Sequence, residues 1–537
     1  MYNDELTVSK WALNSAVECH PHTVEVVGSN PTAPTISTKF HASSAHILVR
    51  VLFAGFLLTL PPSRDKLPKD FSFAFLIFSG EKVGLCRKSA LVGLTTIRRN
   101  ISMHPIGFSF VKSMTLALLT VALAAHASAS TEKVLYTFTG GNDGGLPVAG
   151  LILDKSGNLY GSAAGGGSQA CNGGCGLIFE LSPNSAGGWS EKVLYSFTGG
   201  NDGSYPEARL IADNAGNLYG TALNGGSGAC GCGTVFELKP NGDGSWTEIT
   251  LHSFTGGMDG ENPNAPLVFG KAGNFFGTTF FGGVPTCYAD VGCGTVFELR
   301  PTASGWSETV LYRFTGGTDG AFLRGGLILD KAGSLFGTTE AGGGTGCYGL
   351  GCGTIFSLGH TKAGWKESVL YSFGGSTDGA FPEAGLTQDA AGKLYGTTGQ
   401  GGDANCNVGG GLGGCGVVFE MSNSTGKWKQ TVLYSFTGGQ DASFPLDGVS
   451  FYGANLYGTT QEGGGSGCFQ GNGCGAVFEL KSSQTGWAES ILHSFSDGND
   501  GASAQWGSVI FDHKGNLFGT TQNGGAYEQG TVFEVTP

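Results

Sequence analysis

Three short blocks recur seven times in the same order along residues 130–537, and this repetition constrains the fold more than any other feature. The first block reads Val-Leu-Tyr-x-Phe, and its terminal Phe residues are 59, 57, 60, 59, 63 and 59 residues apart. A fixed period of this length marks one supersecondary unit per repeat. The terminal residues are Phe138, Phe197, Phe254, Phe314, Phe373, Phe436 and Phe495.

Each unit reads as four strands. The first is an apolar run such as 150–154, which ends in a turn with Asp154 at its start and Gly157 where a positive φ is needed. The second is Asn-Leu-Tyr-Gly, the third is Gly-Thr-Val-Phe-Glu-Leu, and the fourth runs from a Trp to the Val-Leu-Tyr-x-Phe block. Four β-branched and aromatic strands per repeat predict an all-β fold, a seven-bladed β-propeller of four-stranded blades.

The two ends of the repeat region complement each other. Residues 134–138 form a fourth strand with no blade of its own, and residues 508–535 supply three strands without a fourth. We therefore expect the N-terminal strand to complete the last blade, which removes exposed strand edges. The alternative is an open solenoid of seven units.

Composition excludes several other classes. The chain has 97 Gly and 18 Pro among 537 residues, and Gly costs about 1 kcal/mol relative to Ala in a helix, so a helical bundle is excluded. An apolar fraction of 40% argues against disorder. The net charge of −13 argues against nucleic acid or an anionic membrane as the main partner.

Residues 1–102 lack the Gly-rich repeats, and we interpret them as a spurious or disordered extension; a real N-terminal extension is the alternative. Their apolar stretches, 47–60 and 71–78, are too short to span a bilayer. Residues 103–129 have the layout of a signal peptide, with Lys112, an apolar core at 114–125 and small residues around Ala127; the alternative is a buried helix. We expect a mature monomer that starts near Ser128 or Ser130, lies outside the cell or in the periplasm, and has no membrane contact after cleavage.

The blocks VLYSFTGG, GNLYGTT and GCGTVFEL resemble the GloVer-type tandem repeats of secreted bacterial proteins, over about residues 130–537. The resemblance implies a surface-directed protein of uncharacterised function, often with a C-terminal sorting anchor. The sequence departs from that pattern, since no anchor is recognised. The stretch LILDKSGNLYGS is also similar, less specifically, to the repeat of two-component sensor propellers.

Six units carry two cysteines between their second and third strands, and the seventh carries neither. Pairs that are present or absent together in an exported protein predict local disulfides that pin a Gly-rich loop. Metal binding is the rival, and it needs four clustered ligands. The bridge between Cys230 and Cys232 is the questionable one, because so small a ring is strained. The predicted pairs are Cys171 with Cys175, Cys230 with Cys232, Cys287 with Cys293, Cys347 with Cys352, Cys406 with Cys415, and Cys468 with Cys474.

The loops that enter each unit read Gly-Gly-x-Asp-Gly or a close variant and place one Asp at an equivalent position seven times. Asp in such a loop bonds its own backbone, which is ordinary turn chemistry. The rival interpretation is a ring of carboxylates for Ca²⁺, the one cofactor that the sequence suggests. These residues are Asp143, Asp202, Asp259, Asp319, Asp378, Asp441 and Asp500.

No catalytic constellation is visible in the repeats. His252 and His493 replace the Tyr of the fourth strand, while His360 and His513 lie in turns. Function should therefore lie where the repeats differ, on the face that carries the loops between the fourth and first strands and between the second and third. The candidate ligand-binding residues are Arg209, Phe280, Phe281, Arg324, Glu340, Gln400, Gln461, Glu462, Trp506, Gln522 and Asn523.

Amide, carboxylate and aromatic groups around a mouth suit a glycan or an extracellular protein. Our first hypothesis is a secreted, non-catalytic propeller that binds a polysaccharide or a protein at its loop face. The second is a lyase or glycan hydrolase that uses Glu207, Glu383 or Asp447 near the central channel, and such a hydrolase needs two carboxyls roughly 5–9.5 Å apart. The third is a structural cell-surface protein.

Overall fold

The computed structural model describes residues 130–288, 291–406, 412–424, 426–484 and 486–537, and two short strands, β1 (Phe75–Leu76) and β2 (Leu94–Thr95). These two strands pair antiparallel. The chain divides into two compact units, Met1–Ala125 and His126–Pro537. Apart from β1 and β2, the interpretations of residues 1–102 and 103–129 fall outside the described residues and stay predictions.

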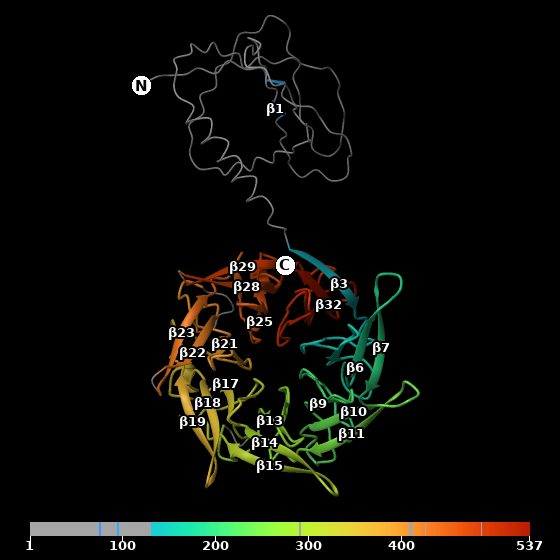
Figure 1. Ribbon diagram of the computed structural model, residues 1–537, viewed down its shortest axis with the longest axis vertical. Coiled ribbons are helices and arrows are strands. Elements are labelled where there is room, and N and C mark those ends of the chain that lie inside the picture. Colours follow the sequence, from blue (N-terminus) through green and yellow to red (C-terminus); the bar gives the residue numbers. More distant parts are fainter. Residues whose placement is uncertain are drawn as a thin grey trace, which may run out of the picture. The chain divides into compact units, whose positions relative to one another are not determined.

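The second unit is a ring of seven four-stranded antiparallel sheets, a seven-bladed β-propeller, as the repeats predict (Figure 1). The innermost strands are β4 (Ile152–Leu153), β8 (Ile211–Ala212), β12 (Val268–Phe269), β16 (Ile328–Leu329), β20 (Thr387–Gln388), β25 (Ser450–Tyr452) and β30 (Ile510–Phe511). The second strands are β5 (Leu159–Ala163), β9 (Leu218–Ala222), β13 (Phe275–Thr279), β17 (Leu335–Thr339), β21 (Leu394–Thr398), β26 (Asn455–Thr460) and β31 (Leu517–Thr521).

The two outer positions of each blade hold longer strands. The third strands are β6 (Leu177–Pro183), β10 (Thr234–Pro240), β14 (Thr295–Thr302), β18 (Thr354–Thr361), β22 (Val417–Asn423), β28 (Ala476–Ser483) and β32 (Thr531–Thr536). The outermost strands are β7 (Trp189–Ser196), β11 (Trp246–Ser253), β15 (Gly305–Arg313), β19 (Gly364–Ser372), β23 (Trp428–Ser435), β29 (Gly486–Ser494) and β3 (Thr131–Thr137).

The ring closes with the N-terminal strand, as predicted. β3 pairs with β32 in a register that sets Thr131 opposite Thr536 and Thr137 opposite Thr531. The last sheet is therefore made of β30, β31, β32 and β3. The expectation of a closed ring is confirmed, and the open solenoid is wrong.

The Gly of each Leu-Tyr-Gly or Leu-Phe-Gly block lets an aromatic ring lie against the second strand. Gly161 faces Phe179 across the β5–β6 pair, and a Cβ on Gly161 would lie 2.5 Å from Phe179 Cζ. The same Phe packs edge-on against Phe138, the last residue of the preceding blade's Val-Leu-Tyr-x-Phe block, with 5.1 Å between ring centroids. All seven blades repeat this Gly–Phe contact and this inter-blade Phe pair.

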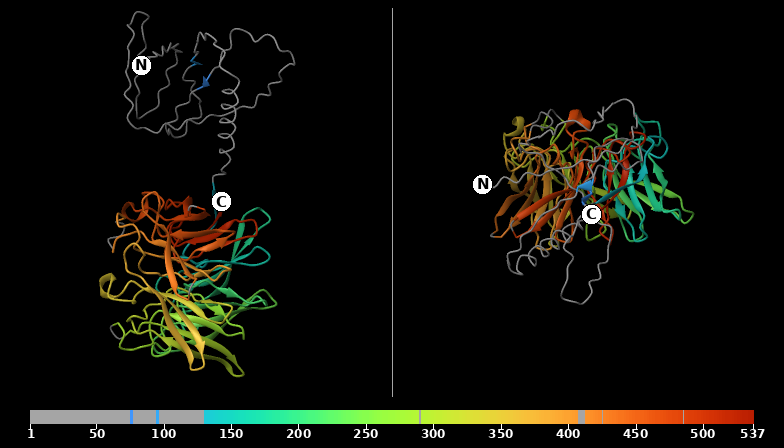
Figure 2. Two further views of the ribbon diagram at one scale, coloured as in Figure 1. Left: turned by 60° about the vertical axis from the view of Figure 1, so that its left-hand side comes forward. Right: turned by 90° about the horizontal axis from the view of Figure 1, so that it is seen from above.

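The loops entering each blade and the loops between its second and third strands share one face, as expected. Bridges such as Gly145–Gly165 and Ser204–Asn224 join them, and in the sixth blade β24 (Ala442–Ser443) pairs with β27 (Glu462–Gly463). Two single turns, η2 (Cys347–Gly349) and α2 (Cys468–Gly471), lie in these loops. Figure 2 shows the blades from two further sides. No helix in the described part of the chain is long and apolar enough to span a membrane.

Candidate functional site: the central cavity

A cavity of about 430 Å³ lies at the centre of the ring, among the segments that precede and form the innermost strands of six blades. These segments follow the same pattern in each repeat, so side chains from one register position meet around the axis. The cavity is both charged and aromatic. Its main polar and aromatic lining residues are Glu207, Arg209, Asn264, Arg324, Glu383, Asp447, Trp506 and Ser508.

Arg324 organises one side of this cavity. Its Nε lies 3.1 Å from Glu340 Oε2 and 3.4 Å from Glu383 Oε2. Its guanidinium carbon lies 4.7 Å from the ring centroid of Phe280 and 5.4 Å from that of Trp506. Two aromatic rings and two carboxylates contact the Arg324 guanidinium, and cation–π contacts add to its ion pairs. These contacts fix the position of the Arg324 side chain at one side of the cavity.

Arg209 differs from Arg324 because it has no ion-pair partner among the described residues. Its side chain runs over the first blade, where a Cβ on Gly150 would lie 3.2 Å from Arg209 Cδ. Its charge acts on Asp447, whose pKa it helps to lower. The Arg209 guanidinium is therefore a donor group free to meet a ligand.

Three acidic side chains of the cavity have raised pKa values. Burial raises the pKa of Asp447 to about 6, against the opposing effects of the Gly448 N–H, the Ser508 hydroxyl and Arg209. Burial also raises the pKa of Glu383, with Glu340 adding to the shift. Burial raises the pKa of Glu207, and Arg324 opposes it. Carboxyls of this kind exchange protons closer to neutral pH than ordinary ones.

Several buried polar atoms at this site lack a well-formed hydrogen bond within the described part of the chain. Asp447 is 9% exposed; its Oδ1 accepts hydrogen bonds from Gly448 N at 2.7 Å and Ser508 Oγ at 3.0 Å, while its Oδ2 has none. Asn264 Oδ1 and Trp506 Nε1 also lack a well-formed hydrogen bond, although the indole N–H is directed closely enough at Glu383 to help lower its pKa. Unsatisfied buried polar atoms in a concave site mark where a ligand makes hydrogen bonds.

The loop that enters each blade carries one non-glycine residue with positive φ, between 52° and 65°. Each donates its N–H to a carbonyl of the preceding blade; Tyr205 N, for example, bonds Cys175 O at 2.9 Å. Six of these acceptors are the second cysteine of a pair, and the seventh is Gln529. These seven hydrogen bonds hold the strained residues in place and fix each entering loop to the preceding blade. The residues are Leu146, Tyr205, Asn262, Phe322, Phe381, Phe444 and Ser503.

All six predicted cysteine pairs are disulfides in the structure, and the questionable small ring is among them. The disulfides lie beneath the loop of the next blade; a Cβ on Gly199 would meet Cys171 Sγ at 2.5 Å. In the last blade the side chain of Gln529 takes this place, 2.8 Å from a Cβ on Gly140. The bonds join Cys171 to Cys175, Cys230 to Cys232, Cys287 to Cys293, Cys347 to Cys352, Cys406 to Cys415, and Cys468 to Cys474.

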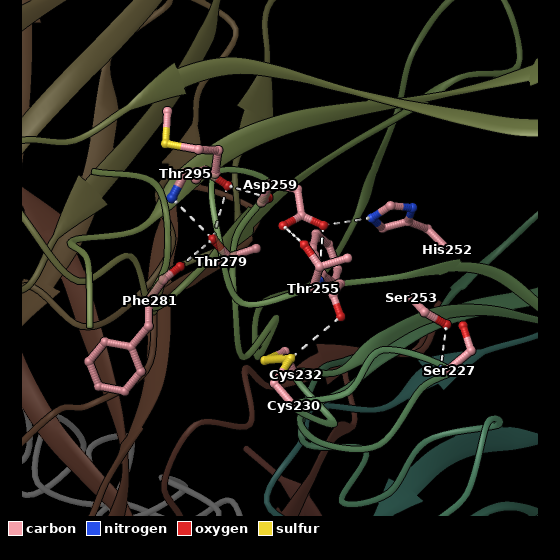
Figure 3. Close-up of polar contacts among 12 residues, drawn as sticks. Ser227, Cys230, Cys232, His252, Ser253, Thr255, Asp259, Thr279, Phe281 and Thr295 are labelled. Carbon is pink, nitrogen blue, oxygen red and sulfur yellow. Dashed lines mark hydrogen bonds and ion pairs between the residues drawn. A yellow bond between two sulfur atoms is a disulfide. The ribbon is translucent and has the colours of Figure 1, made fainter. Parts of the chain in front are cut away.

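The seven loop aspartates bind their own loops. Figure 3 shows the third of them: Asp259 accepts from Thr255 N at 3.0 Å and Thr255 Oγ1 at 2.6 Å, and pairs with His252 at 3.7 Å. In five blades a Tyr hydroxyl replaces the His, as Tyr195 does with Asp202 at 3.0 Å. No group of three or more His, Cys, Asp or Glu in the described residues has a geometry that would hold a metal ion. These contacts are the turn chemistry of the first interpretation.

The structure brings some of the candidate binding residues together. Arg209, Arg324 and Trp506 line the cavity, and Glu340 and Phe280 contact Arg324. Phe281 packs on Phe280, with 4.6 Å between ring centroids.

The other candidates support the loops around the mouth. Gln400 Oε1 accepts from Leu412 N at 3.1 Å, and Gln522 bonds Gln505. Glu462 belongs to β27, and Gln461 and Asn523 make backbone bonds to the loops that enter their own blades.

Sequence reasoning missed two cavity residues, Asn264 and Ser508. Asn264 occupies the register of Glu207, and Ser508 that of Arg209. Aligning the residues that precede each innermost strand would have found both. The three carboxylates named for the enzyme alternative, Glu207, Glu383 and Asp447, all line the cavity.

The Gloeobacter/Verrucomicrobia repeat family matches the chain over residues 124–350, 227–471 and 351–537. No curated protein matches in sequence. Among solved structures, an ulvan lyase of polysaccharide lyase family PL25 is similar at 12% identity, over 73% of this chain and 93% of that one, with a TM-score of 0.43. A gluconolactonase from Xanthomonas campestris is similar at 13% identity, over 77% and 92%, with a TM-score of 0.35.

A putative 6-phosphogluconolactonase from Bacteroides fragilis is similar at 12% identity, over 71% of this chain and 99% of that one, with a TM-score of 0.40. Likeness at these identities and scores carries no argument about substrate or reaction.

Proposed function

We propose that this chain, which belongs to the Gloeobacter/Verrucomicrobia repeat family, is an exported binding protein that holds an acidic saccharide in the central cavity of its propeller. The observation that carries the proposal is a set of polar groups around that cavity. Asp447 Oδ2 and Asn264 Oδ1 are buried without a hydrogen-bond partner among the described residues, Trp506 Nε1 has no well-formed hydrogen bond, and the Arg209 guanidinium makes no ion pair there. A buried polar atom without a partner costs about 1–3 kcal/mol, which a bound ligand recovers.

The mixture of donors and acceptors favours a sugar. Asp447 and Asn264 present acceptors, while Trp506 and Arg209 present donors, and saccharide hydroxyls act as both. The indole of Trp506 also offers an apolar surface beside these groups. A volume of about 430 Å³ lies within the range of small-ligand sites, roughly 300–1,000 Å³, and accommodates one or two sugar rings.

Arg209 supports an acidic sugar over a neutral one. Arg209 lines the cavity and makes no ion pair within 4 Å among the described residues, although its charge acts on Asp447, whereas Arg324 already pairs with two carboxylates. Arg binds a carboxylate or a sulfate through two parallel N–H donors, which is stronger than a contact between neutral groups. A uronate or a sulfate half-ester on the sugar supplies that partner.

A glycan array with the purified protein tests the proposal. Acidic oligosaccharides should be retained, and their neutral analogues should be retained less. The Arg209→Gln variant should lose the preference for acidic sugars. Arg313→Gln is the matched control, since it removes the same charge from β15 on the outside of the ring. If neither acidic nor neutral saccharides bind the wild-type protein, the proposal is wrong.

The raised pKa values of Asp447 and Glu383 favour a second candidate, a lyase or hydrolase that acts on the same saccharide. A general acid or base works best with a pKa near the operating pH. Incubation of the bound oligosaccharide with the protein separates the two functions. A shortened product that Glu383→Gln no longer forms identifies an enzyme, and an unchanged chain length identifies a binding protein.

A further inference from the structure

A ring of acidic side chains lies at the blade interfaces, away from the central cavity. The third residue of the Trp-x-Glu sequence in the outermost strand is Glu in five blades, its counterpart in β3 is Glu132, and in the fifth blade it is Gln430. All seven side chains are half-buried. The glutamates are Glu132, Glu191, Glu248, Glu308, Glu367 and Glu489.

The strand register fixes the direction of these side chains. Glu191 lies directly opposite Leu181 in the β6–β7 pair, and Glu308 lies opposite Leu299 in the β14–β15 pair. Opposite residues in an antiparallel pair share a face of the sheet. Leu181 is fully buried and packs in one cluster with Phe518 and Val532 of the preceding blade. The glutamates therefore point at the preceding blade.

The carboxyl groups are poorly solvated there. In five of the six glutamates Oε1 is buried and has no hydrogen-bond partner; in Glu248 it accepts from Thr250 Oγ1 at 2.9 Å. None of the six makes an ion pair among the described residues. An ionised carboxylate in this position would leave a buried oxygen without compensation.

In the fifth blade Gln430 replaces the glutamate, and its amide has an N–H donor that an ionised carboxylate lacks. The amide of Gln430 donates from Nε2 to the backbone carbonyl of Asp378 at 3.1 Å. Asp378 lies in the loop that leads from β19, the outermost strand of the preceding blade, into the fifth blade, and Asp143 is its equivalent for Glu191. A protonated Glu carboxyl has one O–H donor in the place of the NH₂ group of Gln. It can therefore make the same hydrogen bond as the Gln430 amide.

We propose that the six glutamates are protonated in the folded ring, and that each O–H donates to the backbone carbonyl of the aspartate in the loop that enters its own blade from the preceding one. Each proton then joins the outermost strand of a blade to the loop that connects this blade with the preceding one, so these connections are held by six protons and by one amide. This device is independent of the proposed saccharide site, because it lies in the outermost strands.

Burial and the neighbouring charges both favour the protonated form of these glutamates. Burial raises the pKa of five of these carboxyls from 4.5 to about 7, and it also raises the pKa of Glu132. Neighbouring aspartates raise these pKa values further, while Thr250 lowers that of Glu248, Arg313 that of Glu308 and His493 that of Glu132.

The titratable and charged groups that face the glutamates come from the preceding loop and from nearby strands. Glu191 faces Asp143 and Tyr136, Glu248 faces Asp202 and Tyr195, Glu308 faces Asp259, His252 and Arg313, Glu367 faces Asp319 and Tyr312, Glu489 faces Asp441 and Tyr434, and Glu132 faces Asp500 and His493.

The sign of the pH effect follows from these shifts. A carboxyl with a pKa of about 7 in the folded ring and 4.5 when unfolded keeps its proton longer in the folded state. Its contribution to stability is complete below pH 4.5, falls as the pH rises toward 7, and is constant above that value. The ring should therefore be more stable at about pH 5 than at about pH 8.

Thermal unfolding of the full chain at these two pH values, with substitutions in both directions, tests the proposal. The wild-type melting temperature should fall by on the order of 5 °C or more between about pH 5 and pH 8. A variant with all six glutamates replaced by Gln should lose most of this fall, and the remainder belongs to the cavity carboxyls such as Asp447 and Glu383. Gln430→Glu adds a seventh site, so its melting temperature should fall further than that of the wild type.

Two further measurements keep the test decisive if the sixfold variant does not fold. Glu308→Gln alone should reduce the pH-dependent fall, while Glu528→Gln, an exposed control, should not change it. Infrared spectra of the folded wild type should lose the C=O band of protonated carboxyls as the pH rises through 7, and the loss should be smaller in Glu308→Gln. A wild-type melting temperature that is constant or rises with pH, or spectra without protonated carboxyls at pH 5, would overturn the proposal.

Discussion

The backbone N–H of Leu146 donates to the carbonyl of Gln529 at 2.9 Å and joins the loop that enters the first blade to the last blade. In the other six interfaces the acceptor is the carbonyl of a disulfide-bonded cysteine, namely Cys175, Cys232, Cys293, Cys352, Cys415 or Cys474. Gln529 replaces both the carbonyl and the bulk of that disulfide, because its side chain fills the space beside Gly140. The one blade without cysteines is thus held by the same contact as the rest.

The packing of a loop glycine on four of the disulfides gives a stability prediction. Gly199→Ala would place a Cβ 2.5 Å from Cys171 Sγ, at a φ of 76°. Gly187→Ala is the control, because its φ is 82° and nothing lies within 4 Å of its Cβ. We expect Gly199→Ala to lower the free energy of unfolding by about 1–3 kcal/mol more than the control does, since overpacking adds to the backbone strain. Urea denaturation measures both, and equal losses would contradict the packing account.

Ring closure by β3 predicts a strong dependence on the N-terminal strand. Phe138 is fully buried and packs on Phe179, so Phe138→Ala should reduce the free energy of unfolding by about 3–5 kcal/mol. Deletion of residues 131–138 should in addition expose the edge of β32 and cause aggregation. Lys133→Ala, at an exposed position of the same strand, should melt like the wild type. If the deletion leaves the melting temperature unchanged, β3 does not close the ring.

Much of this fold could be predicted from the sequence, because each blade repeats the same contacts. Gly161 and Phe179 recur at fixed positions in all seven units, and a repeated contact leaves a repeated pattern. The short strands β24 and β27 could not be predicted. Ala442–Ser443 and Glu462–Gly463 have no alternation, and they pair only because the loops of the sixth blade meet.

The candidate site could be predicted only in part. Arg324 and Trp506 stand out because they are unique to one blade, but Glu340 and Glu383 come from different loops, and their pairing with Arg324 depends on the ring geometry. Asn264 carries no unusual sequence signal. It stands out only in the structure, where it lines the cavity and its buried Oδ1 has no hydrogen-bond partner among the described residues.

The Arg324 cluster predicts a coupling between charges. Arg324→Met leaves Glu340 and Glu383 without their cation and should reduce the free energy of unfolding by about 3–5 kcal/mol. Adding Glu383→Gln should restore part of that loss, because it removes a buried negative charge. Arg300→Met is the control variant, because it removes an ion pair with Glu298 in which the Arg side chain is exposed. Loss of this pair should lower the free energy of unfolding by less than about 1 kcal/mol. Chemical denaturation of the wild type and these three variants measures the coupling, and a double variant no more stable than Arg324→Met would contradict it.

Export predicts a processed N-terminus. The sequence of residues 103–129 predicts a signal peptide, and if it is cleaved as proposed the exported protein should begin near Ser128 or Ser130. Intact-mass and N-terminal peptide analysis of the exported protein measures this start. Peptides from residues 2–99 in the exported protein would refute both the cleavage site and the interpretation of residues 1–102.

The central claim is that the cavity of the propeller binds an acidic saccharide through Arg209 and Trp506. The most direct test is isothermal titration calorimetry of the wild type, Arg209→Gln and Trp506→Ala with the acidic oligosaccharide that binds best on the array. We expect one site per chain and an affinity that is about tenfold or more lower in Arg209→Gln, since a hydrogen bond to a charged group contributes about 1.5–3 kcal/mol. Trp506→Ala should bind more weakly still, or not at all. Wild-type affinity in both variants would place the ligand elsewhere and contradict the claim.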